Sequence, residues 1–347
     1  MLKFPALMTK VKALCSKMLS KEDFENLINT SSVTEITEYL KTHTHYSETF
    51  KNIDVSQLHR RDVEILIRRS MLDDFYNIYF YLPTDGKKFF KFMEKRFEIE
   101  NIKVVLRSLH SGHPEYIEKR KLFPLNHRTV DEDSLVSVKS FEDILNVFRG
   151  TEYQKILESS YQSYAKTQKI QHLLNSLDFW YFTTMKKTLD SMPGYSKGLK
   201  ELFYKQVDLT NIQWIYRARI LFKLSTGEVL NFLIPFRRNL TKEDLQELAS
   251  SNTATDFIGK LSSHPYGKYF KGIDENMFPY VIERACEKAL LDDSKRLISM
   301  IQNGFDVMVG YIHIREFEYR DLITLIEAKR YSLSNEKMAN YLISLGG

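Results

Sequence analysis

One pattern of six residues occurs three times along the chain, and this internal repeat limits the possible folds more than any other feature. Residues 97–102, 207–212 and 317–322 each read apolar, acidic, apolar, polar, Asn or Asp, and apolar. The acids occupy positions 98, 208 and 318, so successive copies are 110 residues apart. Solenoid proteins repeat every ~20–50 residues, whereas this spacing is the size of a small domain. We therefore expect three related domains.

Two further markers recur in the same register. Sequences typical of a helix start begin at positions 19, 130 and 240, and acids follow each one in the first turn, where the helix dipole favours them. The expected N-caps of these helices are Ser20, Asp131 and Thr241. A tyrosine follows each start at a similar distance, at Tyr46, Tyr153 and Tyr266. The predicted domains are residues 1–129 (with an additional N-terminal helix), 130–239 and 240–347.

Apolar spacing indicates helices throughout. Val63, Ile67, Met71 and Phe75 recur every three or four residues, which predicts a helix that ends before Pro83. Alternation with a period of two residues is scarce, and only 13 Gly and 8 Pro occur in 347 residues, which argues against a turn-rich β fold. The predicted fold class is all-α, with three similar helical domains of about 110 residues related by pseudo-threefold symmetry.

The polar positions of the repeat are the candidate site residues. They are Glu98, Asn101, Arg107, Asp208, Asn211, Arg217, Glu318 and Asp321. The third copy has Glu327 where the others have arginine. Because the acid and the Asn or Asp are three residues apart, they share one helix face. They could form a polar site built three times, or they could hydrogen-bond neighbouring elements and fix the geometry of each domain. We favour the structural role, because polar groups on otherwise apolar helices are usually satisfied packing contacts.

Catalytic, metal and nucleotide motifs are absent or in the wrong context. Gly194 to Gly198 matches Gly-x-Ser-x-Gly, but a nucleophile elbow needs a strand before Ser196, whereas a helix ending at Pro193 is expected there. No phosphate-binding glycine loop, Cys-x-x-Cys or His-Glu-x-x-His occurs. We expect no catalytic residue, no cofactor, no metal and no small-molecule substrate.

Charge and cysteine content restrict the partners and the compartment. The net charge of +5 comes from dispersed basic pairs that lie near acids, so we expect no nucleic-acid partner. No window of about 20 residues lacks charge, and no secretory signal is recognised. With only Cys15 and Cys286, a disulfide framework is excluded and a cytosolic location is expected.

The ordered set of motifs resembles the C/d-type subunits of V-type and A-type rotary ATPases. The resemblance extends from about Leu7 to Leu342 and depends on the order of the motifs rather than on any single one. Its segments are Asp23 to Ile28, Leu40 to Tyr46, Phe97 to Arg107, Asp208 to Arg219, Glu316 to Arg330, and the tails Leu224 to Glu228 and Leu333 to Glu336.

The resemblance implies a funnel of three helical domains without catalytic residues. Such a subunit is a socket in the central stalk: it sits on the cytoplasmic mouth of the membrane rotor ring of proteolipid subunits and receives the foot of the central shaft. There it turns with the rotor and couples ATP hydrolysis or synthesis to H⁺ or Na⁺ transport. The implied location is peripheral, on the cytoplasmic face of the membrane. The residues that contact shaft and ring, the ion and the direction of the reaction stay open. The alternative is a cytosolic helical scaffold that binds a different protein.

Overall fold

The computed structural model describes residues 4–191, 197–272, 280–299 and 304–345. Within these ranges the secondary structure is helical and contains no strand, as the sequence predicts for an all-α fold. By its internal contacts the chain divides into two compact units, one comprising residues 1–81 with 194–347 and the other residues 82–193. We call them unit 1 and unit 2 and describe each by itself.

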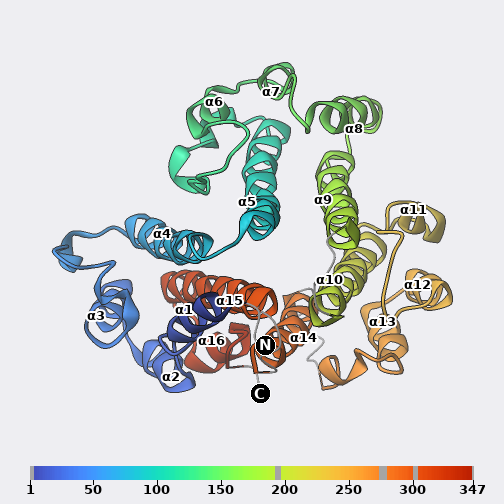
Figure 1. Ribbon diagram of the computed structural model, residues 1–347. Helices are drawn as coiled ribbons and strands as arrows, with labels where there is room; N and C mark the ends of the chain where they lie inside the picture. Colours follow the sequence, from blue (N-terminus) through green and yellow to red (C-terminus); the bar gives the residue numbers. More distant parts are fainter. Residues whose placement is uncertain (1–3, 192–196, 273–279, 300–303, 346–347) are drawn as a thin grey trace. The chain divides into compact units, whose positions relative to one another are not determined.

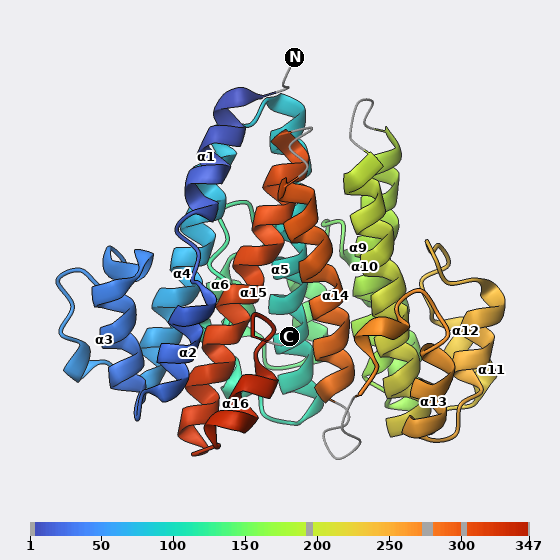
Figure 2. The ribbon, with the colours of Figure 1, turned by 90° about the horizontal axis from the view of Figure 1, so that it is seen from below.

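Unit 1 is assembled from both ends of the chain (Figures 1 and 2). Its helices are α1 (Pro5–Cys15), α2 (Lys21–Asn29), α3 (Val33–His43), α4 (Arg60–Tyr79), α10 (Lys197–Tyr216), α11 (Thr226–Asn231), α12 (Lys242–Ala249), α13 (Ala254–Leu261), α14 (Tyr280–Ser299), α15 (Gly304–Arg330) and α16 (Asn335–Tyr341). The π-helical turn Arg217–Leu221 continues α10. Helix α4 confirms the helix predicted before Pro83.

Helix α15 is the centre of unit 1. It packs against α1, α4 and α14, and most of its residues from Gly304 to Ala328 are buried. Figure 2 shows α14 and α15 side by side. Gly310 permits this close approach, because a Cβ atom at that position would lie only 2.9 Å from the backbone oxygen of Ser294. A helix buried on nearly all sides can carry polar groups only where partners satisfy them.

Unit 2 is a continuous stretch of chain. It contains α5 (Thr84–His110), α6 (Glu132–Ser137), α7 (Phe141–Val147), α8 (Gln154–Thr167) and α9 (Gln171–Ser191). Helix α5 packs against α9, and α9 packs against α8. The buried Lys103 on α5 forms an ion pair of 2.5 Å with Asp178 on α9, and Phe92 stacks on Tyr181 across the same pair of helices. Unit 2 therefore has one long helix, α5, onto which shorter helices fold.

The helix starts that the sequence predicts are confirmed. Ser20, Asp131 and Thr241 are the N-caps of α2, α6 and α12, and each side chain accepts a hydrogen bond from the backbone N–H three residues later. Ser20 and Thr241 also form complete capping boxes with Asp23 and Asp244. Each of these caps satisfies one of the N–H groups that a helix start leaves unpaired.

Candidate functional site: three clasps on the long helices

The repeated polar residues lie in the long helices α5, α10 and α15, where each set holds segments from elsewhere in the same unit. We call these sets clasps. Clasp 1 comprises Lys95, Glu98, Asn101 and Tyr153; clasp 2 comprises Lys205, Asp208, Asn211 and Tyr266; clasp 3 comprises Arg315, Glu318, Asp321 and Tyr46. Clasp 1 belongs to unit 2, and clasps 2 and 3 belong to unit 1.

Clasp 1 is centred on the carboxylate of Glu98, which is buried in α5. It accepts hydrogen bonds from the Tyr153 hydroxyl (2.8 Å), from the Thr129 hydroxyl (2.9 Å) and from the Thr129 backbone N–H. The ammonium group of Lys95 lies 3.4 Å from the same carboxylate and 5.5 Å from the centre of the Tyr153 ring. The acid thus joins α5 to the chain just before α6 and to the start of α8.

Clasp 2 repeats this arrangement in α10. The fully buried Asp208 accepts from the Tyr266 hydroxyl (2.7 Å) and from the backbone N–H groups of Arg238 (3.0 Å) and Asn239 (2.8 Å). Burial nevertheless raises the pKa of Asp208 above its ordinary value. Lys205 lies over the Tyr266 ring at 5.8 Å, but its ammonium bonds Asp293 and the Ala289 carbonyl on α14. Here the basic residue joins α10 to α14 and does not pair with the clasp acid.

Clasp 3 joins α15 to the N-terminal part of unit 1. Glu318 accepts from the Leu19 backbone N–H (2.7 Å) and from the Tyr46 hydroxyl (3.1 Å). The Arg315 guanidinium donates to Glu318 (2.7 Å) and to the Tyr46 oxygen, and it lies over the Tyr46 ring at 4.9 Å. Tyr46 is therefore both a donor and an acceptor in this network.

Arg315 is fully buried and has a second acidic partner. Its Nε donates to Asp74 on α4 (2.8 Å), whose carboxylate also accepts from the Tyr311 hydroxyl (3.1 Å). Burial lowers the pKa of Arg315, but Tyr46, Glu318 and Asp74 together raise it above its ordinary value. A buried guanidinium is stable only when its charge and its donors are matched, and clasp 3 supplies both.

Three residues after each acid, the Asn or Asp holds a second backbone segment. Asn101 exchanges two hydrogen bonds with the backbone of Phe123 (2.9 and 2.7 Å), and Asn211 does the same with Ile234 (3.1 and 2.9 Å). Asp321 accepts from the backbone N–H groups of Ile343 and Ser344, both at 2.8 Å. In each clasp, the acid and the residue three positions after it thus hold different segments of the chain.

The structure places the other predicted site residues at the surface. Arg107 is half exposed and lies 4.0 Å from Glu100, and Arg217 pairs with Glu283 on α14. Glu327, which stands where the first two copies have arginine, pairs with Arg60 on α4 and with Arg330. None of these ion pairs includes a clasp acid. The hydrolase motif at Ser196 lies largely outside the described residues.

The basic residues of the clasps are not among the site residues predicted from the sequence, although they carry a signal. Lys95, Lys205 and Arg315 each stand three residues before the acid and are 110 residues apart. Three residues is less than one helical turn, which places base and acid on one face. The tyrosines are visible as repeat markers, but nothing in the sequence shows that their hydroxyls reach the acids.

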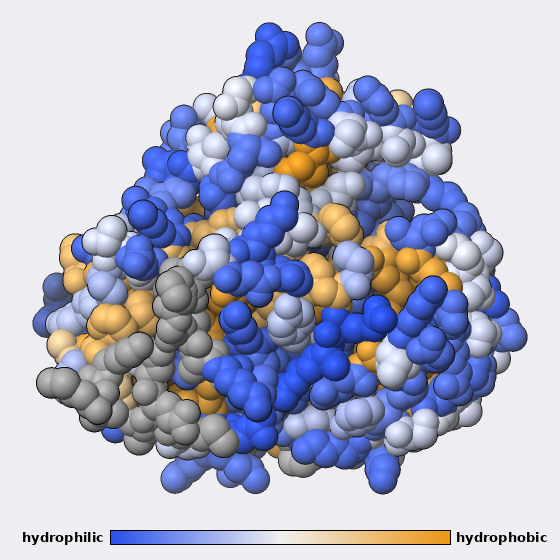
Figure 3. Space-filling model, turned by 45° about the vertical axis from the view of Figure 1, so that its right-hand side comes forward, coloured by the Kyte–Doolittle hydropathy of each residue, from blue (hydrophilic) through white to orange (hydrophobic). Residues whose placement is uncertain are grey.

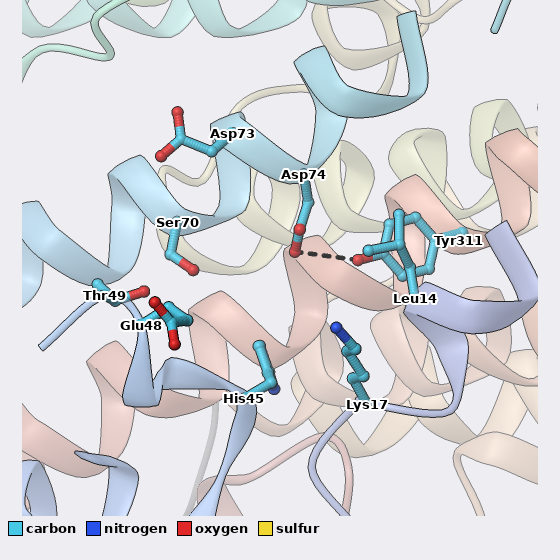
Figure 4. A pocket seen from close by; sticks show the side chains of 9 residues that line it. All are labelled: Leu14, Lys17, His45, Glu48, Thr49, Ser70, Asp73, Asp74 and Tyr311. Atoms are coloured by element: carbon cyan, nitrogen blue, oxygen red, sulfur yellow. Dashed lines mark hydrogen bonds between the residues drawn. The ribbon is translucent and has the colours of Figure 1, made fainter. Parts of the chain in front are cut away.

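A pocket of about 300 Å³ opens beside clasp 3 (Figure 4). Its lining includes Lys17, His45, Asp73, Asp74 and Tyr311. In Figure 4 the Tyr311 hydroxyl bonds Asp74, whereas Asp73 points away from both. Burial lowers the pKa of His45, and the nearby Glu318 opposes this effect. Among the described residues, no group of three or more His, Cys, Asp or Glu side chains is arranged to hold a metal ion.

The fold and the clasps define a class: an all-helical protein whose repeated polar residues bind its own segments. Comparison with known proteins agrees with the resemblance that the sequence motifs carry. The family model described as ATP synthase (C/AC39) subunit matches residues 7–341. The chain is 26% identical to the C subunit of the A-type ATP synthase of Methanocaldococcus jannaschii, over 79% of this chain and 70% of that one. It is 23% identical to the proteins of the same name from Methanosphaera stadtmanae (93% and 83% covered) and Methanobrevibacter smithii (96% and 86%).

Because the family model covers almost the whole sequence, the chain belongs to the ATP synthase (C/AC39) subunit family. It is accordingly a non-catalytic subunit of an ATP synthase rather than an enzyme in its own right. None of the helices in the described part of the chain is long and apolar enough to cross a membrane.

Proposed function

We propose that this chain is the central-stalk subunit that links the shaft of a V/A-type rotary ATPase to its membrane rotor ring. In this role it couples ATP hydrolysis or synthesis to H⁺ or Na⁺ transport as a peripheral subunit on the cytoplasmic face. Its partners are the shaft subunits and the ring of proteolipid subunits. The observation that carries the proposal is the family match over residues 7–341, together with relatives named as the C subunit of A-type ATP synthases.

The clasps suit a part that transmits torque. Such a part must resist deformation, and each clasp joins a long helix to at least three other segments, largely through buried hydrogen bonds. Buried polar networks in which every member has a partner hold elements in one arrangement. We therefore propose that the repeat-signature residues are structural. We also propose three repeat domains, 1–129, 130–239 and 240–347, with α15 of the third closing onto the first.

Exposed apolar side chains are the candidate contact points for partners. Figure 3 shows a largely hydrophilic face with small hydrophobic areas between the polar residues. The most exposed large apolar residues of the described chain include Phe80 (77%), Tyr331 (65%) and Phe222 (53%). Single apolar residues are common on protein surfaces, but protein–protein interfaces are enriched in aromatic side chains. We propose that at least one of them contacts a shaft or ring subunit.

The test is purification of the tagged full chain from its own host in mild detergent. The product is separated on a native gel stained for ATPase activity, and the co-purifying proteins are identified. We expect an active complex that contains a shaft subunit and a proteolipid ring subunit. A lone monomer of 41.0 kDa from native membranes would contradict the proposal and favour the scaffold alternative.

The contact residues are tested in the same purification. Phe80→Ser, Phe222→Ser and Tyr331→Ser are compared with Lys51→Ser, which changes a side chain that is also largely exposed but charged. At least one aromatic substitution should lower the yield of shaft or ring subunits at an unchanged level of the tagged chain. Unchanged yields in all three would exclude these residues as anchors without affecting the assignment to the complex.

A further inference from the structure

A second pocket, of about 320 Å³, opens in unit 1 where the link between α1 and α2 meets α14 and α15. It shares no lining residue with the pocket of Figure 4. Its apolar lining is Met18, Leu19, Phe24, Leu291, Ile298 and Ile314. We call it the α14 pocket. Its volume is at the lower end of the range of about 300–1,000 Å³ for binding pockets, so it suits one large side chain.

The charged groups of the α14 pocket make it basic. Glu318 is the one acid among the described residues that line it, and Arg315 already pairs with that acid. Two lysines line the same pocket. Lys21 pairs with the exposed Glu25 at 3.7 Å, and Lys295 has no hydrogen-bond or ion-pair partner among the described residues. The pocket therefore attracts an apolar group that carries a negative charge beside it.

The corresponding place in the other two clasps is filled by the chain's own side chains. It is marked by the residue four positions before each acid, which is Glu94, Tyr204 or Ile314. In clasp 1, His127 pairs with Glu94 at 2.8 Å. In clasp 2, the ring of Phe236 meets the ring of Tyr204 edge-on, with centroids 6.0 Å apart.

Clasp 3 has a small residue at the matching position. Phe236 stands five residues before the N-cap Thr241. The residue five positions before the N-cap Ser20 is Cys15. Cys15 and Ile314 both line the α14 pocket, so the small thiol leaves open a space that an aromatic ring fills in clasp 2. An aromatic ring that enters this space gains the dispersion contacts that an empty pocket lacks.

We propose that the α14 pocket receives an aromatic side chain that a partner subunit presents next to a carboxylate. The ring takes the place that Phe236 takes in clasp 2, and the carboxylate lies beside Lys21 and Lys295. Aromatic side chains that enter such pockets are frequent anchors of protein–protein interfaces. The inference rests on the proposed function, because it takes the partner to be a shaft or ring subunit of the complex.

The experiment uses photochemical cross-linking in the assembled complex. A lysine analogue with a diazirine group replaces Lys295 in the tagged full chain, which is purified from its own host in mild detergent and then illuminated. We expect a cross-link to a shaft or ring subunit, in a peptide where an aromatic residue stands close to an acid. The same analogue at position 51, where the lysine side chain is 63% exposed, is the control and should not link to that peptide.

The outcomes separate this inference from the proposed function. A cross-link to a second copy of this chain would overturn the inference, and so would an intact complex without a cross-link from position 295. Both results would leave the proposed function in place. Purification of the chain without any shaft or ring subunit would contradict both.

Filling the pocket from within the chain is the first matched test. Cys15→Phe copies the aromatic residue of clasp 2, whereas Cys15→Ser leaves the pocket open. The yield of the cross-link from position 295 should fall at least about fivefold in Cys15→Phe and stay unchanged in Cys15→Ser. Equal yields in the two variants would overturn the proposal. A Tm of the isolated Cys15→Phe chain at or above that of Cys15→Ser shows that its fold is intact.

Reversing one charge is the second matched test, and it leaves the core untouched. Lys21→Glu puts an acid into the first turn of α2, where the helix dipole favours it, so the helix should not be weakened. The cross-link yield should fall at least about threefold relative to Lys51→Glu, because like charges oppose each other in an interface. An undiminished yield in Lys21→Glu would overturn the proposal.

Discussion

Clasps 1 and 3 share one arrangement of a base, an acid and a tyrosine but perform different tasks in the chain. Glu98 binds partners 31 and 55 residues away, whereas Glu318 binds partners 299 and 272 residues away. Lys95 is 17% exposed and has Glu152 as a further partner, whereas Arg315 is fully buried between two carboxylates. The comparison shows that one sequence motif can complete a local fold or join distant parts of a chain, and that the base is the more deeply buried in the clasp that joins distant parts.

The predictions need separate signals from the two units, and the two tryptophans supply them. Trp214 lies in α10 of unit 1, and Trp180 lies in α9 of unit 2. Urea unfolding followed by fluorescence in Trp180→Phe and Trp214→Phe backgrounds therefore reports the free energy of unfolding for each unit.

The largest effect is expected at the buried base. Arg315→Ala leaves Glu318 and Asp74 without their cation, and removing one partner of a buried ion pair costs about 3–5 kcal/mol. Lys95→Ala should cost about 1 kcal/mol, because Lys95 is partly exposed and Glu98 keeps its other donors. Arg107→Ala, a half-exposed basic residue, is the control and should change the free energy by less than about 0.5 kcal/mol. Equal losses of unfolding free energy for Arg315→Ala and Lys95→Ala would refute the distinction between clasps 1 and 3.

The tyrosine substitutions should follow the same order, with a larger loss of stability in clasp 3 than in clasp 1. Tyr46→Phe removes both a donor to Glu318 and an acceptor for Arg315, and should destabilise unit 1 by about 2–3 kcal/mol. Tyr153→Phe removes one donor from Glu98, which still accepts from Thr129, and should destabilise unit 2 by about 1 kcal/mol. A larger loss in Tyr153→Phe would show that the two clasps do not differ in the way we describe.

Clasp 3 should also respond to pH through His45. Burial lowers the pKa of His45 below its ordinary value of 6.5, so the unfolded chain binds more protons than the folded one as the pH falls below 6.5. Stability from this group is complete above that pH and is lost on acidification. His45→Gln should reduce the loss of unit 1 stability between about pH 7.5 and about pH 5.5 relative to wild type. Identical pH profiles for the two proteins would exclude His45 as a source of the acid-dependent loss of stability.

The smallest effects are expected at the helix caps. Ser20→Ala and Thr241→Ala each disrupt a capping box and should cost about 1 kcal/mol. Asp131→Ala removes the cap of the short α6 in unit 2 without a capping box and should cost about 0.5 kcal/mol. Comparison of Tm values for the three single variants checks the order. A greater loss in Asp131→Ala than in Ser20→Ala would show that the short helix depends more on its cap.

The sequence predicts those parts of the clasps that repeat locally. Helix class, the three N-caps and the side-by-side placement of acid and amide follow from spacing within about ten residues. The recurrence also marks Tyr46, Tyr153 and Tyr266, because each follows its helix start at a similar distance.

Other parts could not be predicted because they depend on tertiary contacts. Asp74 and Asp293 each end a Leu-Asp-Asp sequence and pair with the bases Arg315 and Lys205, but these pairings appear only when α4 lies against α15 and α14 lies against α10. The hydrogen bond that Ile343 donates to Asp321 likewise depends on where the segment after α16 lies in the fold. The basic residues at 95, 205 and 315 are within reach of the repeat pattern, but the substitution of arginine for lysine and their different partners obscure the equivalence.

The central position of α15 has a consequence for synthesis. Unit 2 is continuous in the chain, so all of its partners have left the ribosome once residue 193 is clear of the exit tunnel. The buried faces of α1 and α4 must wait for α15, which is made last among the long helices. During that interval Tyr46 and the apolar residues of α1 lack their final partners, which leaves the early part of unit 1 prone to aggregation until α15 has been made.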